Sequence, residues 1–328
     1  MNYRKLGKTG FSISEISLGT WQVGGKWGTR FDRKLAERIL RTAIDAGINF
    51  IDTADVYSDG ESEIAVGKAV KGSRDRVFVA TKCGRQVQPH VNSGYQPEVL
   101  RNYVEESLKR LGTDCIDLVQ LHCPPAEVYY RPEIFHEFEK LKQEGKILNL
   151  GVSIEKVEEG IKAMEYENVT SIQVIYNMFR QRPHELLFKL AEEKNVGIIV
   201  RVPLASGLLS GKFSLGTTFE KEDHRNFNIN GDYFDKGETF AGIPFAKGID
   251  AVEKLKTRFR GGPEFYKIAL KWILHRNEVS CIIPGASHPD QVTRNIEAAD
   301  IKALAAEERE FINEVYRNLI MEEVHQRW

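Results

Sequence analysis

Short apolar runs alternate with longer amphipathic segments along most of the chain. Runs such as residues 77–80 and 197–200 are almost continuously apolar, which is typical of strands buried on both faces of a sheet. The segments between the runs, such as residues 35–44, carry apolar residues at a spacing of three and four, which predicts helices. The pattern predicts eight strands, which begin near residues 16, 49, 77, 116, 147, 171, 197 and 280.

Predicted helices fill the intervals between these strands. An alternation of eight strands and helices predicts a (β/α)8 TIM barrel, and near-continuous apolar strands fit its parallel sheet. The alternative is a doubly wound open sheet, but no GxGxxG motif follows the first strand. The helices are predicted at residues 35–44, 62–70, 97–108, 134–143, 157–164, 185–193 and 263–275, from 289, and at 304–319.

Two segments depart from this rhythm. Residues 3–16 have the turn and alternation of a β-hairpin, which we expect to form a lid over one end of the barrel. Residues 205–245, after the seventh strand, are rich in Gly, Phe, Asn and Asp and show little periodicity. Such long loops in compact domains are usually functional lids. We expect residues 1–328 to form a single domain.

Composition narrows the classes of function. The 328 residues carry a net charge of −1, which gives no basic footprint for nucleic acid or a membrane surface. No signal-peptide core and no membrane-spanning run is present. The eight histidines show no metal-ligand spacing, so no metal is expected. The four scattered cysteines predict reduced thiols in a cytoplasmic protein, namely Cys83, Cys115, Cys123 and Cys281.

Titratable residues stand where three successive strands are predicted to end. Asp52 and Tyr57 follow the second strand, Lys82 ends the third and His122 ends the fourth. In a barrel these ends meet on one face. Lys82 would lower the pKa of Tyr57, and Asp52 would hold Lys82 in place. Tyr57 could then protonate a developing alkoxide while His122 orients the carbonyl oxygen. The alternative is a core salt bridge with a structural histidine.

The motifs around these residues resemble those of the aldo-keto reductases. The similarity lies in residues 52–57 (DTADVY), in Thr81-Lys82 and in residues 118–122 (LVQLH), and it extends over nearly the whole chain. The resemblance implies that Tyr57 is the general acid/base, assisted by Asp52, Lys82 and His122. It also implies hydride exchange between NAD(P)(H) and a carbonyl/alcohol pair in a small-molecule substrate.

The resemblance also implies a cofactor site. Ser153 and Gln173 match residues that hold the nicotinamide carboxamide, and residues 203–212 match the segment that wraps the pyrophosphate. Residues 284–287 match the strand–helix junction that binds adenosine. The alternative is that these residues simply begin an ordinary N-capped helix. The residues implied to contact the cofactor are Gly19, Thr20, Trp21, Asp52, Ser153, Gln173, Arg201, Pro203, Leu204, Ser206, Lys212, Gly285, Ser287, Gln291 and Asn295.

Three positions depart from the family pattern. Ile154 replaces a common Asn beside the carboxamide. Arg201 stands where many members stack an aromatic residue on the nicotinamide, so we expect Arg201 beside that ring, or directed at the substrate or an anion. Gly285 and Gln291 replace the basic residues that hold the 2′-phosphate in many members. Because Ser287 and Gln291 are similar to the pattern of potassium-channel β-subunits, which bind NADP(H), we place NADP(H) ahead of NAD(H).

Substrate determinants are less distinct. The resemblance places Trp21, Tyr57 and His122 against the substrate. The polar residues of segment 205–245 would suit a hydroxylated compound such as a sugar, or would simply form a solvated loop. Further side chains that could close over a substrate are Trp27, Tyr129, Tyr130, Arg225, Asn226, Asn228, Asn230, Tyr233 and Phe234. A regulatory subunit that senses the redox state of the nucleotide, with little turnover, is the alternative function.

Overall fold

A computed structural model describes residues 1–25, 30–259 and 264–328. Eight strands form one parallel sheet in which each strand pairs with its neighbours in chain order. Bridges from Ile16 to Ile282 and from Gly19 to Gly285 join the first strand to the last, so the sheet closes into the predicted (β/α)8 barrel. The strands are β3 (Leu18–Gly19), β4 (Phe50–Asp52), β5 (Phe78–Cys83), β6 (Ile116–His122), β7 (Ile147–Ser153), β8 (Val169–Ile175), β9 (Gly197–Arg201) and β10 (Val279–Ile282).

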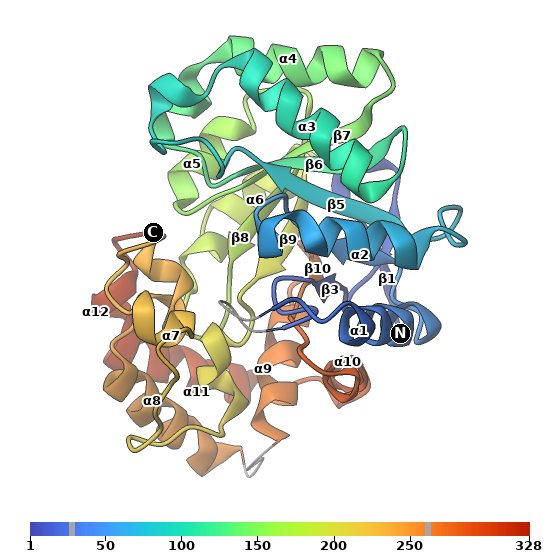
Figure 1. The fold of residues 1–328 in the computed structure, drawn as a ribbon. Helices are drawn as coiled ribbons and strands as arrows, with labels where there is room; N and C mark the ends of the chain where they lie inside the picture. The colour runs from blue at the N-terminus through green and yellow to red at the C-terminus, as the bar shows by residue number, and fades with distance from the viewer. Residues whose placement is uncertain (26–29, 260–263) are drawn as a thin grey trace.

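Helices surround the barrel (Figure 1). Local signals set their ends: the Asp32 side chain accepts from the backbone N–H groups of Lys34 and Leu35 at the start of α1, and left-handed Gly112 ends α3. Among the described residues, no helix is long and apolar enough to cross a membrane. The main helices are α1 (Arg33–Asp45), α2 (Glu61–Val70), α3 (Pro97–Leu111), α4 (Pro132–Gln143), α5 (Val157–Ala163), α6 (Leu187–Glu193), α8 (Phe245–Arg258), α9 (Phe265–Leu274), α10 (Pro289–Ile296), α11 (Ala306–Val315) and α12 (Met321–Val324).

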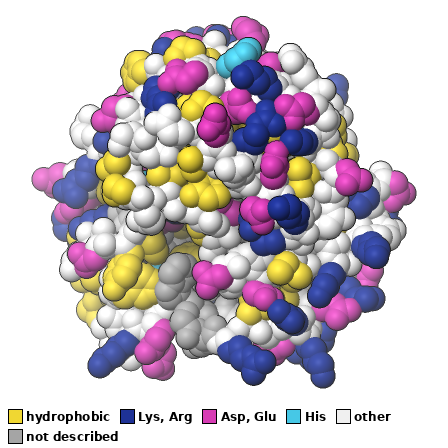
Figure 2. All heavy atoms as spheres, turned by 45° about the horizontal axis from the view of Figure 1, so that its top comes forward, with side chains coloured by type: hydrophobic (Ala, Val, Ile, Leu, Met, Phe, Trp, Pro, Cys, Tyr) yellow, Lys and Arg dark blue, Asp and Glu magenta, His cyan; other side chains and the backbone are white. Residues whose placement is uncertain are grey.

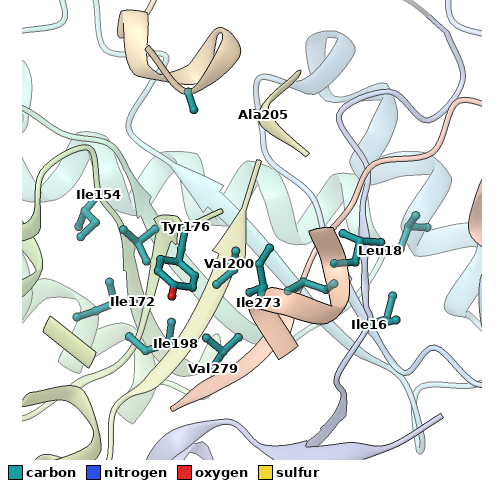
Figure 3. Packing of buried hydrophobic residues seen from close by; sticks show 14 of the residues in the cluster. Ile16, Leu18, Ile154, Ile172, Tyr176, Ile198, Val200, Ala205, Ile273 and Val279 are labelled. Atoms are coloured by element: carbon teal, nitrogen blue, oxygen red, sulfur yellow. The ribbon is translucent and has the colours of Figure 1, made fainter. Parts of the chain in front are cut away.

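The apolar core has two parts because successive strand residues point to opposite faces. Ile198 and Val200 point outward and pack in the layer between sheet and helices (Figure 3). Ile199 points inward and belongs to a smaller cluster inside the barrel. This division explains why the strands are apolar throughout.

The N-terminal hairpin lies against one end of the barrel, as predicted. Strands β1 (Tyr3–Lys5) and β2 (Ser12–Ser14) pair in antiparallel fashion. Leu6 and Ile13 are buried in the inner cluster, and the ring of Phe11 stacks on that of Phe78 with the centroids 4.2 Å apart. Because Phe78 begins β5, the hairpin covers the end where the strands start, and the opposite end carries the candidate chemistry.

The long segment after β9 folds over that opposite end. It contains helical turns at Ala205–Ser210 and the short helix α7 (His224–Phe227) before α8 begins. The ring of His224 lies 4.6 Å, centroid to centroid, from the indole of Trp21, which follows β3. The predicted lid position is thus observed, but α8 was not predicted.

Candidate active site

The carboxyl ends of β4, β5 and β6 bring Asp52, Lys82 and His122 together. Parallel pairing sets Lys82 opposite Gln120 and His122 opposite Ser153. Asp52 and Lys82 are each only 1% exposed, and His122 is 4% exposed. Residues distant in sequence therefore share one buried volume because their strands end on the same face.

Asp52, Lys82 and Tyr57 form a continuous chain of contacts. The Nζ of Lys82 donates to Asp52 Oδ1 at 2.5 Å, to the carbonyl of Thr53 at 2.9 Å and to the hydroxyl of Tyr57 at 3.2 Å. The three donor positions of the ammonium are thereby engaged. The geometry fixes the ammonium beside the phenol, as the sequence predicts.

Two glutamines complete the environment of Asp52. The second carboxylate oxygen of Asp52 accepts from Gln120 Nε2 at 2.9 Å and from Gln173 Nε2 at 2.8 Å. The sequence analysis missed Gln120. Gln120 stands two positions before His122 and therefore shares its face of the strand, which was the available signal.

The expected lowering of the pKa of Tyr57 is wrong in its net direction. Burial is the largest effect and raises the pKa of Tyr57 above its usual 10, while the Lys82 ammonium opposes the rise. For Lys82 itself, burial lowers the pKa, but Asp52 and Tyr57 outweigh it, and the net pKa is raised. Tyr57 is therefore a phenol at neutral pH, with the Lys82 ammonium beside its hydroxyl.

His122 faces Tyr57 across the site. The two rings are nearly perpendicular, with centroids 6.0 Å apart. Burial, followed by the positive charges of Arg85 and Lys82, places the pKa of His122 well below 6.5. The imidazole is therefore neutral at physiological pH. Its Nδ1 is buried without a hydrogen-bond partner among the described residues, and its Nε2 lies 3.5 Å from Arg85 NH1.

A second charged group, which we call the arginine–glutamate cluster, adjoins His122 and consists of Arg85, Glu155, Arg201 and Glu238. Arg85 NH2 lies 2.9 Å from a carboxylate oxygen of Glu238 and 3.5 Å from one of Glu155. Arg201 NH2 lies 3.1 Å from Glu155, and Arg201 NH1 lies 3.6 Å from Glu238. Only Arg201 was singled out from the sequence.

The cluster defines the surroundings of Arg201. Its NH2 also donates to the carbonyl oxygen of Ile154 at 3.0 Å and lies 3.5 Å from the sulfur of Cys123. Cys123, Glu155 and Glu238 bring three potential metal-ligand atoms within 4.8 Å of one another. Arg201 contacts all three of these residues.

Ile154 has a structural role. Its side chain is fully buried and lies outside the barrel, in the packing layer of Figure 3. A Cβ on Gly160 of α5 would come within 2.8 Å of Ile154 Cδ1. The side chain therefore packs against α5, and only the backbone carbonyl of Ile154 faces the cluster.

The residues of the predicted cofactor site lie along the carboxyl ends of the strands. Ser153 ends β7, and Gln173 lies in β8. In segment 203–212, Ala205 and Ser206 have positive φ angles and turn the chain sharply, and Lys212 is exposed. In the first turn of α10, Gln291 Oε1 accepts from the backbone N–H of Ser287 at 2.7 Å; near the end of the same helix, Asn295 Nδ2 donates to the carbonyl of Gly285 at 3.4 Å.

Close packing explains why glycine stands at position 19. It pairs with Gly285 where the barrel closes, and a Cβ at Gly19 would lie 2.7 Å from the carbonyl oxygen of Ile283. Thr20 is buried and donates to the carbonyl of Asp52 at 3.1 Å. Both residues thus hold β3 against its neighbours, whatever else they contact.

A cavity of about 1160 Å³ opens between β3, the turn after β4 and the long segment. Trp21, Val56, Ser58, His224 and Ser287 are among its lining residues. The cavity thus connects the neighbourhood of Tyr57 with the start of α10. It is larger than most small-molecule pockets, which measure roughly 300–1,000 Å³.

The residues proposed to close over a substrate fall into different places. Phe234 packs edge-on to Trp21, with centroids 6.1 Å apart, and belongs to the lid. Asn228 is fully buried and accepts from the backbone N–H groups of Tyr233 and Phe234, so its role is structural. Tyr129 is buried in the core, and Tyr130 is 68% exposed.

The other members of that group lie at the surface of the segment. Arg225 pairs with Asp223, 2.5 Å away, and covers the ring of Phe219. Asn226, Asn230 and Tyr233 are exposed. Trp27 lies outside the described residues. On the face shown in Figure 2, basic and acidic side chains are interspersed, in keeping with the net charge of −1.

Comparison with known proteins places the chain in a family. A family model described as "Aldo/keto reductase family" matches residues 15–317. The chain is 33% identical to aldo-keto reductase YhdN of Bacillus subtilis, in an alignment covering 99% of this chain and 96% of that protein. It is 30% identical to the NADH-specific methylglyoxal reductase of Escherichia coli, over 90% of this chain and 93% of the other.

Solved structures agree. The glycerol dehydrogenase AKR11B4 from Gluconobacter oxydans superimposes with a TM-score of 0.78 at 30% identity, covering 97% of this chain and 96% of that one. The chain belongs to the aldo/keto reductase family. Members of this family are oxidoreductases that act on carbonyls and alcohols and use nicotinamide cofactors.

Proposed function

We propose that the protein interconverts a carbonyl and an alcohol by hydride transfer with NAD(P)(H), and that Tyr57 is the general acid/base. The observation that carries the proposal is the contact chain from Asp52 through Lys82 to the Tyr57 hydroxyl. In that chain a charged carboxylate fixes an ammonium, and the ammonium lies beside a phenol. A purely structural salt bridge has no need of the phenol.

The proton step follows from these contacts. When bound, NAD(P)H supplies the hydride that reduces the carbonyl carbon. As negative charge develops on the carbonyl oxygen, the Tyr57 O–H bond breaks and its proton moves to that oxygen, which becomes the alcohol hydroxyl. The electron pair stays on Tyr57 as a phenolate, which Lys82 stabilises at 3.2 Å. In alcohol oxidation the same proton returns to Tyr57.

His122 supplies the second contact to the carbonyl oxygen. A neutral imidazole can donate one N–H hydrogen bond without losing its proton, and the strongly lowered pKa of His122 keeps the ring neutral. With Tyr57 and His122 facing each other, a carbonyl oxygen between them would be held by two donors. Orientation of the carbonyl and donation of the proton are thus divided between two residues.

The residues present fit a nicotinamide dinucleotide. Ser153 offers a hydroxyl, and Gln173 offers its amide oxygen because its nitrogen already donates to Asp52 and Gln120; both can hydrogen-bond a carboxamide. Residues 203–212 and the start of α10, with Gly285, Ser287, Gln291 and Asn295, would hold the pyrophosphate and adenosine. The large cavity between Trp21 and Ser287 gives room for an extended ligand.

We place NADP(H) ahead of NAD(H) on the pattern of Ser287 and Gln291. A relative at 30% identity is named an NADH-specific enzyme. The ratio of the affinities for NADPH and NADH therefore decides the cofactor preference. Competition between NADPH and NADH, followed by fluorescence, measures that ratio. Tighter binding of NADH would reverse the preference.

We propose a small hydroxylated carbonyl or alcohol, such as a sugar or polyol, as the substrate class. The similar glycerol dehydrogenase supports this class. The polar and charged side chains beside His122 support it as well, since substrate hydroxyl groups can add hydrogen bonds to them and an aliphatic chain cannot. A panel of aldehydes, sugars and polyols with the preferred cofactor tests the proposal.

The substitution Tyr57→Phe tests the chemistry. We expect kcat to fall by about 10²- to 10⁴-fold, which is the usual contribution of a general acid, with nearly unchanged affinity for NADPH by fluorescence titration. Tyr3→Phe, at the opposite end of the barrel, is the matched control and should retain full activity. Wild-type turnover in Tyr57→Phe would refute the assignment. Tight nucleotide binding with near-zero turnover in the wild-type protein would instead favour the redox-sensing alternative.

A further inference from the structure

Arg85 carries its charge beside the imidazole of His122. It follows β5 by two residues, and its NH1 is 3.5 Å from Nε2 of His122. The side chain is 21% exposed, so part of it remains accessible. In the proposed mechanism Tyr57 and His122 would flank the carbonyl oxygen, so a group beside His122 would face the carbon next to the reacting carbonyl.

The long segment holds Arg85 in this position. Glu238 accepts from Arg85 NH2 at 2.9 Å, and the ring of Phe234 lies 5.8 Å from the guanidinium carbon. Glu155 adds a contact at 3.5 Å from the strand side. A guanidinium fixed on three sides offers its remaining donors to a ligand at little cost in conformational entropy.

We propose that Arg85 recognises an oxygen on the carbon next to the reacting carbonyl, and so selects 2-hydroxy and 2-oxo carbonyl compounds. The inference rests on the proposed function and narrows its substrate class. A substrate without this oxygen would displace water from Arg85 without replacing the hydrogen bonds. Arg85 is thus a specificity residue, distinct from the residues that move the proton.

The Glu238 carboxylate disfavours a second negatively charged oxygen beside Arg85. Burial raises the pKa of Glu155 to about 8, so at pH 7 Glu238 is the charged partner of Arg85, 2.9 Å from its NH2. Glu238 already engages Arg85 directly, and a substrate carboxylate would approach it at close range. Hydroxyl and oxo groups accept hydrogen bonds from Arg85 without that repulsion. We therefore expect glycolaldehyde or glyceraldehyde to be preferred over glyoxylate.

The test compares two aldehydes that differ in their hydroxyl groups. In Arg85→Met, the ratio of kcat/KM for glyceraldehyde to kcat/KM for propanal should fall by roughly 10- to 100-fold, the range for a lost hydrogen bond to a charged group. Comparing the ratio in variant and wild type cancels the different hydration of the two aldehydes. Arg85→Lys, which keeps the charge, should recover part of the ratio. The exposed Arg41→Met is the matched control, and its ratio should equal that of the wild type.

A binding measurement on the wild-type protein covers the case in which Arg85→Met fails to fold. With bound NADP⁺, 1,2-propanediol should bind at least about tenfold more tightly than 1-propanol. Equal binding of the two alcohols, or an unchanged aldehyde ratio in Arg85→Met, would overturn the role of Arg85 while leaving the carbonyl reduction intact. Failure of the wild-type protein to reduce either aldehyde would overturn the proposed function itself.

Discussion

The site contains two charged groups of different construction. Asp52, Lys82 and His122 all lie on strands of the barrel, and Tyr57 is on the turn after β4. In the arginine–glutamate cluster, Arg201 ends β9, but Arg85 and Glu155 follow their strands and Glu238 comes from the long segment. The first group is therefore fixed by the barrel alone, whereas the second also requires the lid to be folded in place.

The two groups also differ in how hydrogen-bond donors and positive charges compensate the charge of their carboxylates. Asp52 receives hydrogen bonds from Lys82, Gln120 and Gln173, so its charge is distributed among three donors. In the cluster, burial raises the pKa of Glu155 to about 8, with Glu238 adding to the rise and Arg201 opposing it. A fully matched carboxylate suits a permanent scaffold for catalysis. In the arginine–glutamate cluster the carboxylates have fewer hydrogen-bond donors, which suits a surface that binds varied ligands.

The largest effect should follow from Lys82→Met. In the proposed mechanism Lys82 stabilises the Tyr57 phenolate, so we expect its removal to lower kcat by about 10²- to 10⁴-fold. It also leaves Asp52 buried without its charged partner, which is destabilising. The double variant Asp52→Asn/Lys82→Met restores charge balance, so it should regain thermal stability while staying inactive. If the double variant were active, the barrel-borne group would be only structural.

Glu238→Gln should have a smaller effect, confined to the cluster. Removing this carboxylate leaves Arg85 less neutralised, so kcat/KM for glyoxylate should rise relative to glycolaldehyde, by roughly 3- to 10-fold. The free energy of unfolding should fall by about 1.5–3 kcal/mol, the range for a hydrogen bond to a charged group. Substrate assays at pH 7 and urea denaturation measure these changes. Glu222→Gln, at an exposed position of the same segment, serves as the control, and equal behaviour of the two variants would contradict the prediction.

The contrast between the groups also explains what could be predicted from the sequence. Apolar runs mark the strands, so the strand-end residues Asp52, Lys82 and His122 follow from counting the strands. Glu238 lies in a segment without periodicity, and its position depends on how the lid folds. Sequence patterns do not encode that path.

Two features were not predicted correctly from the sequence, and each has a local cause. Helix α8 carries apolar residues at 245, 249, 252 and 255, which is helical spacing, but Gly248 and the irregular segment before it concealed the pattern. The pKa of Tyr57 was misjudged because the sequence reveals a nearby charge but not the extent of burial. Burial proved to be the larger effect.

Asp55 offers the smallest and most specific prediction, because it lies three residues after Asp52 and is equally buried. Neither of its carboxylate oxygens has a hydrogen-bond partner among the described residues. Burial, and then the charge of Glu63, raises the pKa of Asp55 to about 7 from 3.8. Between these two pH values the folded protein retains a proton that the unfolded chain has lost. The free energy of unfolding should therefore fall as pH rises, by up to about 1.4 kcal/mol per pH unit.

Asp55→Asn removes this titration while keeping the shape of the side chain. We expect the variant to be more stable than the wild type at pH 8, with a difference that shrinks as the pH approaches 4. Urea denaturation at several pH values measures both slopes, and the exposed Asp59→Asn is the control. Parallel curves for wild type and Asp55→Asn would mean that Asp55 is matched by a partner, as Asp52 is. A flatter curve for the variant would show that only one of the two buried aspartates in this motif is held in its charged form.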